Sequence, residues 1–376
     1  AKIKVLKQNP DLLSINIDNI ANSAVRRFDG QWPRSNEPQF LFDIDVSYLI
    51  DATRPCTFLS IGAGGGSDVL QALQAGAEEI HAVEVNPHIK SLMLSGWLAE
   101  FSGKIYQDPR VRVITDDARA YVRRHPATFD VILSVSSNTH AALISGAFAL
   151  AENYLYTIEA MMDYYRALSS KGYLVLEHQF FIPRILAGAM EALSREGIRD
   201  PGRHLAVFTD PRKMRNILIM AKAPLQSETI HRALGAGDVG GRAAFRLLYP
   251  VERIAPDNLL ARIITEGWRR VGIRVPIDLS PCSDNRPFIS QMGLWRNFSW
   301  AHLASPSPLM EVTGFPLAKA IIAAILLVIL ILVIPLNILP YLIGPREKLS
   351  QPAWLYFFLI GIGFMALEVV LIQRYT

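Results

Sequence analysis

Short apolar runs alternate with amphipathic segments through the middle of the chain. Five such runs predict strands, at 57–61, 79–83, 111–114, 129–133 and 173–176. Segments with apolar residues at helical spacing follow them and predict helices, at 68–75, 86–97, 119–124, 158–168 and 183–196. Two last apolar runs, 205–209 and 217–221, are joined by a link so short that an antiparallel pair is favoured. The pattern predicts an α/β domain with a mixed seven-stranded sheet, not the six-stranded parallel sheet of dinucleotide dehydrogenases.

The segments on either side of this domain have different patterns. In residues 1–52, Ile15 and Ile17 alternate with polar residues and the turn 29–30 follows, which predicts a β-hairpin entry segment. The α/β domain itself covers 53–225. Residues 226–312 predict a helical extension and linker, and residues 313–376 form a separate apolar part.

The C-terminal part predicts two transmembrane helices, at about 317–340 and 353–372. About 20 apolar residues are needed to cross a bilayer core of about 30 Å. Aromatic residues, among them Trp354 and Tyr356, stand where the second span begins, as at a membrane interface. The alternative is a buried pair of helices in a soluble protein. Glu368 lies inside the second span, where an ionisable group indicates function unless it reaches water or pairs with another helix.

Composition narrows the classes of function. The 376 residues are 51% hydrophobic and carry a net charge of +4, with no basic stripe between aromatics, so we expect no nucleic-acid partner. Two cysteines exclude a disulfide framework or a zinc cluster, and we expect no metal. The chain starts without Met and without a signal-peptide pattern, so we expect a piece of a longer protein with further transmembrane helices.

The stretch 58–87 carries the clearest chemistry. A strand is followed by Gly62, Gly64, Gly65 and Gly66, then a helix, a second strand and Glu84. Glycines let the backbone approach a ligand closely, and a helix amino terminus offers free N–H groups. A carboxylate at the end of the second strand can accept hydrogen bonds from both ribose hydroxyls. The unit therefore predicts a site for an adenosine-type ligand.

Three acidic residues help to distinguish S-adenosylmethionine from NAD as the ligand. Asp116 and Asp117 end the third strand, where a carboxylate can accept from the adenine amine and the Ala118 N–H can donate to the ring. Asp68 follows the glycines and can accept from an α-amino group, which NAD lacks. These positions favour S-adenosylmethionine over NAD. The alternative for Asp116 and Asp117 is that one of them caps the next helix.

Several longer stretches together resemble one family. They are IGAGGGSDVL (61–70), VEVNP (83–87), DPRVRVITDDAR (108–119), FDVILS (129–134), GAFALAENYLYTIEA (146–160), SDNRPF (283–288) and GFMALEVVLIQRYT (363–376). The chain resembles the spermidine synthase-like group of class I S-adenosylmethionine-dependent transferases, and within it the bacterial branch fused to transmembrane helices. The resemblance implies a Rossmann-like fold and a site for S-adenosylmethionine or its decarboxylated form, formed by Gly62, Gly64, Gly66, Glu84, Asp117 and Ala118.

The resemblance also implies transfer of an aminopropyl group to a small amine, with an acid after the fourth strand that orients and deprotonates the amine. This chain has no carboxylate at 133–140, so polyamine synthesis is in doubt and methyl transfer is an alternative. A catalytically degenerate protein that binds a ligand, or is linked to transport, is a second alternative. The catalytic candidates are Asn138, His140 and Glu152, and the substrate-side candidates are Tyr48, Tyr154 and Tyr156.

The cofactor is made in the cytoplasm, so the large domain is expected to face it. This predicts a multi-pass protein of the bacterial inner membrane, with the lipid bilayer as a partner.

Overall fold

The computed structural model describes two units, residues 1–320 and 321–376, each considered by itself. The residues that it describes are 3–17, 21–32, 42, 44–135, 153–178, 181–210, 215–233, 246–247, 277–303, 314–343, 355–356, 358–361 and 363.

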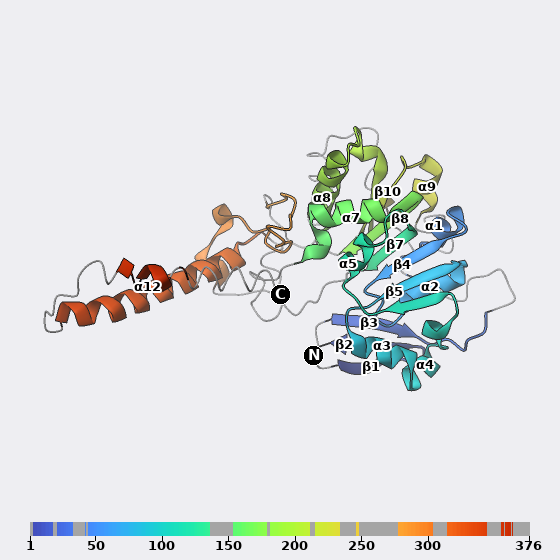
Figure 1. Cartoon of the computed structure of the whole chain (residues 1–376), viewed down its shortest axis with the longest axis horizontal. Helices are drawn as coiled ribbons and strands as arrows, with labels where there is room; N and C mark the ends of the chain where they lie inside the picture. The colour runs from blue at the N-terminus through green and yellow to red at the C-terminus, as the bar shows by residue number, and fades with distance from the viewer. Residues whose placement is uncertain are drawn as a thin grey trace. The chain divides into compact units, whose positions relative to one another are not determined.

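A small antiparallel sheet forms where the sequence predicts a hairpin. Its strands are β1 (Ile3–Asn9), β2 (Leu12–Ile17) and β3 (Ala21–Arg26), in that order. Leu13 pairs with Val25, and both side chains are buried. Figure 1 shows this sheet beside α3 (Pro87–Leu94) and α4 (Trp97–Phe101). The amide of Phe28 donates to the carbonyl of Phe101 over 3.0 Å and joins the two parts.

The larger sheet has eight strands among the described residues, in the order β11-β9-β10-β8-β7-β4-β5-β6. The strands are β4 (Thr57–Ile61), β5 (Glu79–Val83), β6 (Val111–Ile114), β7 (Phe129–Val135), β8 (Leu168–His178), β9 (Leu205–Asp210), β10 (Arg215–Ala221) and β11 (Arg246–Leu247). The strands from β4 to β8 pair in parallel, and β10 pairs antiparallel with both β8 and β9. The predicted mixed sheet of seven strands is confirmed, and β11 adds two residues at its edge.

Two predicted elements of the α/β domain differ from the observed ones by more than one or two residues at an end. The helix predicted at 86–97 ends at Leu94, and α4 begins after Gly96, whose φ of 80° breaks the helical path. Strand β8 starts at Leu168, so the turn predicted at 171–172 lies within a strand. A Cβ at Gly172 would lie 2.7 Å from the Phe129 carbonyl oxygen, so this close pairing with β7 requires glycine.

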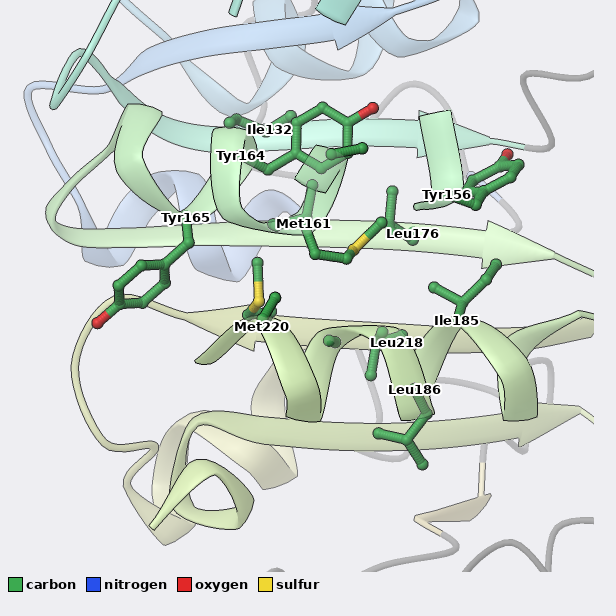
Figure 2. Close-up of a cluster of buried hydrophobic side chains, with 14 of the residues drawn as sticks. Ile132, Tyr156, Met161, Tyr164, Tyr165, Leu176, Ile185, Leu186, Leu218 and Met220 are labelled. Carbon is green, nitrogen blue, oxygen red and sulfur yellow. The ribbon is translucent and has the colours of Figure 1, made fainter. Parts of the chain in front are cut away.

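Each face of the larger sheet has its own apolar core. One core contains α5 (Ala118–Arg123), α7 (Ile158–Ala167) and α8 (Ile182–Arg195). Figure 2 shows labelled members of this core, with Tyr164 of α7 beside Ile132 of β7 and Met161 of α7 beside Leu176 of β8. The other core contains α1 (Ser47–Ala52), α2 (Ser67–Ala75), α3 and part of the small sheet. Remaining described elements are α9 (Ser227–Arg232), α11 (Trp300–Leu303), η1 (Ile105–Gln107), η3 (Tyr154–Tyr156), η4 (Pro201–His204) and η6 (Trp295–Asn297).

The C-terminal apolar part contains α12 (Leu317–Ile343), which covers the first predicted span. Over the residues whose side chains the structure describes, no helix combines the length and the apolar character needed to cross a membrane. The first span stays a prediction. The second span, at 353–372, lies largely outside the described residues, and Glu368 lies wholly outside them.

Candidate functional site

The glycine-rich turn joins β4 to α2 at the carboxyl edge of the larger sheet. Gly62 and Gly66 have φ angles of 74° and 81°, in the left-handed region that side chains rarely allow. Gly66 is the N-cap residue of α2. The succession of strand, turn, helix and strand that the sequence predicts at this edge is confirmed.

The five backbone amides of the turn all donate to acceptors within the protein. The donor and acceptor pairs are Gly62 to Val83 O (2.9 Å), Ala63 to Val83 O (3.1 Å), Gly64 to Glu84 Oε2 (3.1 Å), Gly65 to Ser23 Oγ (2.7 Å) and Gly66 to Ala63 O (2.8 Å). A phosphate bound by such a turn needs amides that point at it. These five amides are already engaged, so the turn is poorly suited to a pyrophosphate.

Strand β3 packs directly on the glycine-rich turn. A Cβ at Gly65 would lie 2.4 Å from the Ala24 carbonyl oxygen, and the Ser67 hydroxyl donates to that same oxygen over 3.0 Å. A Cβ at Gly64 would lie 2.3 Å from the Ser23 hydroxyl oxygen. The close backbone approach that the sequence predicts for a ligand is therefore made at these two glycines by the chain's own β3.

Glu84 lies at the end of β5 and is only 6% exposed. One carboxylate oxygen accepts the Gly64 N–H, and the other accepts the Asn86 N–H over 2.8 Å. Burial raises the pKa of Glu84, and these two N–H groups oppose that rise. A carboxylate has about four acceptor positions, so both oxygens keep capacity for ribose hydroxyls.

The acidic pair after β6 has roles within the protein. Asp117 caps α5, because its Oδ1 accepts the Ala120 N–H over 2.7 Å. Asp116 accepts the Asp117 N–H over 2.9 Å and forms an ion pair with Arg124. The alternative role of Asp117 as a helix cap is thus confirmed. Contact of Asp117 and Ala118 with adenine stays a prediction.

A second buried carboxylate lies on the same face of the sheet as Asp68. Asp68 accepts the Ser60 hydroxyl over 3.1 Å at the start of α2. Glu177, near the end of β8, is 2% exposed and pairs in register with Val135, the last residue of β7. Burial, and then repulsion from Glu177, raise the pKa of Asp68 to about 6. The sequence reasoning missed Glu177, although a charged residue that ends an apolar strand was the available signal.

The pKa of Asp68 leads to a pH-dependent prediction. Its value of about 6 lies above the ordinary 3.8, so the folded protein holds this proton more tightly than the unfolded chain. The resulting stabilisation is present at low pH and is lost as pH rises through about 6. We expect Asp68→Asn, which removes the charge, to be more stable than wild type at about pH 8 and to lose most of this advantage at about pH 4.5.

Urea unfolding of both proteins at the two pH values measures this difference. Asn keeps an oxygen that can accept the Ser60 hydroxyl, so the comparison isolates the charge. A stability difference that is the same at both pH values would contradict the prediction.

Arg119, the residue after Ala118, ties the 283–288 stretch to the helices beside the site. Its guanidinium donates to both oxygens of Asp284, over 2.6 and 2.8 Å, and to Asp163 over 2.8 Å. Asp284 also accepts the Thr157 hydroxyl over 2.7 Å. The network raises the pKa of Arg119 and keeps that of Asp284 low, so both stay charged.

Arg184 of α8 fixes the same region from within the core. It is 2% exposed, and its guanidinium donates to the carbonyls of Ser280, Phe288, Ile289 and Gln291 over 2.7 to 3.1 Å. The sequence reasoning found the SDNRPF stretch by resemblance, but it did not identify either arginine that holds it.

The structure separates the three candidate tyrosines. Tyr156 is buried, and its ring packs edge-on against His178 at 5.8 Å, beside the end of β8. Figure 2 shows Tyr156 near the arrowhead ends of the strands. Tyr154 is 38% exposed in η3. Tyr48 lies on α1 with Arg232 over its ring at 4.6 Å, and it packs against the core that contains α2. Asn138, His140 and Glu152 lie outside the described residues.

Comparison with known proteins finds similarity to solved structures at low sequence identity. No protein-family model matches the chain, and no curated protein sequence matches it. The chain is similar to the spermidine synthase of Thermotoga maritima at 17% identity, over 73% of this chain and 81% of that one, with a TM-score of 0.42. It is similar to a spermidine synthase in complex with the transition state analogue AdoDATO at 17% identity, over 73% and 80%, with a TM-score of 0.38. At these values function has to be inferred from this chain's own residues.

Proposed function

We propose that this chain is a transferase that binds S-adenosylmethionine or its decarboxylated form and transfers a methyl or aminopropyl group to an amine. The observation that carries the proposal is Glu84, a buried carboxylate at the end of β5 against the glycine-rich turn. A carboxylate in this position suits the two hydroxyls of a ribose. The mixed sheet, with its antiparallel pair β9–β10, is consistent with such a site.

The hydrogen bonds of the glycine-rich turn favour this ligand class over NAD. A dinucleotide carries a pyrophosphate, which needs unengaged amides in the turn. Here the five amides of 62–66 are bonded to protein acceptors, and β3 covers Gly64 and Gly65. S-Adenosylmethionine has an adenosine and no phosphate, so it makes no such demand.

Asp68 and Glu177 support an amine as the acceptor. When bound, the cofactor supplies a carbon activated by its sulfonium. The partly buried Asp68 and the buried Glu177 can together hold a cationic amine, and a carboxylate with a pKa of about 6 can accept the proton that the attacking amine loses. Asp68 and Glu177 thus supply carboxylates, which residues 133–140 lack.

Attachment to a bilayer is the second part of the proposal. The side chains of α12 from Ile325 to Leu332 are apolar and each is 49% to 59% exposed. A helix that is apolar all round calls for an apolar environment. We place the C-terminal helices in the bacterial inner membrane and the α/β unit on the cytoplasmic side, where the cofactor is made.

Calorimetry with S-adenosylmethionine, its decarboxylated form and methylthioadenosine tests the ligand class. We expect binding of at least one of them, and the preferred one distinguishes methyl from aminopropyl transfer. No heat with any of the three, from protein shown to be folded by circular dichroism, would exclude the proposal.

A binding protein without turnover is the alternative, favoured by the carboxylate-free stretch at 133–140. Mass spectrometry of a mixture of candidate amines after incubation with the preferred cofactor separates the two. A methylated or aminopropylated product that is lost in the Glu84→Gln variant would favour the transferase. Binding without any product would favour the alternative.

A further inference from the structure

Two tryptophans are unusually exposed just before α12 begins. Trp295 in η6 is 53% exposed and Trp300 in α11 is 78% exposed. The ring of Phe298 lies between them, 6.2 Å from Trp295 and 5.1 Å from Trp300, and stacks on Phe315 at 5.6 Å. We refer to Trp295, Phe298, Trp300 and Phe315 as the aromatic collar.

The aromatic collar is attached to the start of α12 by polar contacts on both sides. The side-chain amide of Asn297 donates to the Gly314 carbonyl over 2.9 Å, and the Leu294 N–H donates to the same oxygen over 3.2 Å. The Lys319 ammonium donates to the Gly293 carbonyl over 2.7 Å. All these residues belong to the unit 1–320, so the collar has a defined position relative to the first turn of α12.

Close backbone packing holds the same junction. A Cβ at Gly293 would lie 2.3 Å from the Phe315 carbonyl oxygen, so only glycine allows the two segments to approach this closely. A fixed junction means that the exposed rings present a constant surface.

The chemical properties of the exposed rings indicate which kind of surface the collar contacts. An indole ring combines a large apolar face with one N–H donor, and this combination is enriched where hydrocarbon meets water in membranes. Arg296 follows Trp295 in the sequence and Lys319 lies in the first turn of α12, and both positive charges suit anionic headgroups. The exposed apolar side chains of α12 start directly beyond, from Ile322 onward.

We propose that the aromatic collar lies in the headgroup region of the bilayer and fixes the depth at which α12 enters it. The inference rests on the proposed membrane attachment and is independent of the cofactor. The occupant of the surface is a lipid bilayer that contains anionic lipid.

Spin labels on the full chain test the collar. Both native cysteines are buried, so a nitroxide can be directed to Trp300→Cys or Trp295→Cys. Trp97→Cys is the matched control, because Trp97 is 59% exposed on α4. In phosphatidylcholine–phosphatidylglycerol vesicles, we expect labels at 295 and 300 to collide more with oxygen than with a water-soluble nickel chelate, and the label at 97 to show the reverse.

The outcomes distinguish the collar from the proposed membrane attachment and from the proposed binding of an adenosyl ligand. Protein that floats with vesicles while label 300 collides like label 97 overturns the collar alone. Protein that does not float with vesicles overturns both the collar and the attachment. Neither result affects ligand binding in calorimetry.

A measurement without labels covers the case in which the cysteine variants do not fold. Lipids brominated near the headgroup should quench tryptophan fluorescence of the wild type more than that of the Trp295→Phe, Trp300→Phe double variant. Equal fractional quenching of the two proteins overturns the collar.

Discussion

Replacement of Arg184 by methionine is expected to lower the free energy of unfolding by about 3–5 kcal/mol, the usual cost of breaking a buried charged network. Methionine fills a similar volume, so the loss comes mainly from polar groups that lose their donor. Four backbone carbonyls, of Ser280, Phe288, Ile289 and Gln291, accept from this guanidinium. Asp278 would also lose a positive charge 3.9 Å away.

The planar fork of arginine is as important here as its charge. Arg184→Lys keeps the charge but cannot reach four acceptors in different directions. We therefore expect the lysine variant to recover only a small part of the lost stability. The segment from Ser280 to Gln291 should lose hydrogen-exchange protection in both variants, because Arg184 donates to four of its backbone carbonyls.

Urea unfolding of the full chain in detergent measures the loss. Arg195→Met on the same helix is the matched control, because Arg195 is half-exposed and pairs with Glu191 across one helical turn. Its change should stay within about 0.5 kcal/mol. Equal losses for the two variants would show that the four carbonyl contacts of Arg184 do not stabilise the fold.

Glu84→Gln is expected to weaken binding of the adenosyl ligand by about 100-fold. A hydrogen bond to a charged acceptor contributes about 1.5 kcal/mol or more, and 1.4 kcal/mol is a factor of ten, so two ribose hydroxyls account for that loss. Glutamine also places an NH2 group against a backbone N–H of Gly64 or Asn86, both of which now donate to the carboxylate. We therefore expect Glu84→Gln both to weaken ligand binding and to disturb the backbone around Gly64 and Asn86.

Calorimetry with S-adenosylmethionine and methylthioadenosine at a temperature where both proteins are folded measures this change. Glu100→Gln is the control, because the carboxylate of Glu100 forms an exposed ion pair with Lys104. We expect the control to bind like wild type. Unchanged affinity in Glu84→Gln would remove the central support for the adenosyl site.

Local patterns were enough to predict most elements of the α/β unit. Strand β4, the turn and α2 follow from an apolar run, glycines and helical spacing, all within about 20 residues. The antiparallel pair β9–β10 follows from a short link. Boundaries differed where the backbone of one glycine decided them, through a φ of 80° at Gly96 and through the close approach of Gly172 to β7.

The candidate site was predicted only in part, because several of its contacts join distant segments. The sequence by itself determined the mixed sheet, the glycine-rich turn and the place of Glu84, since these depend on neighbours along the chain. Only the tertiary structure decided that β3 covers Gly65 and that Glu177 is near enough to Asp68 to raise its pKa. It also decided that Arg119 holds Asp284 across 165 residues. Such contacts depend on which strands become neighbours in the sheet, and no local pattern of apolar and polar residues encodes that pairing.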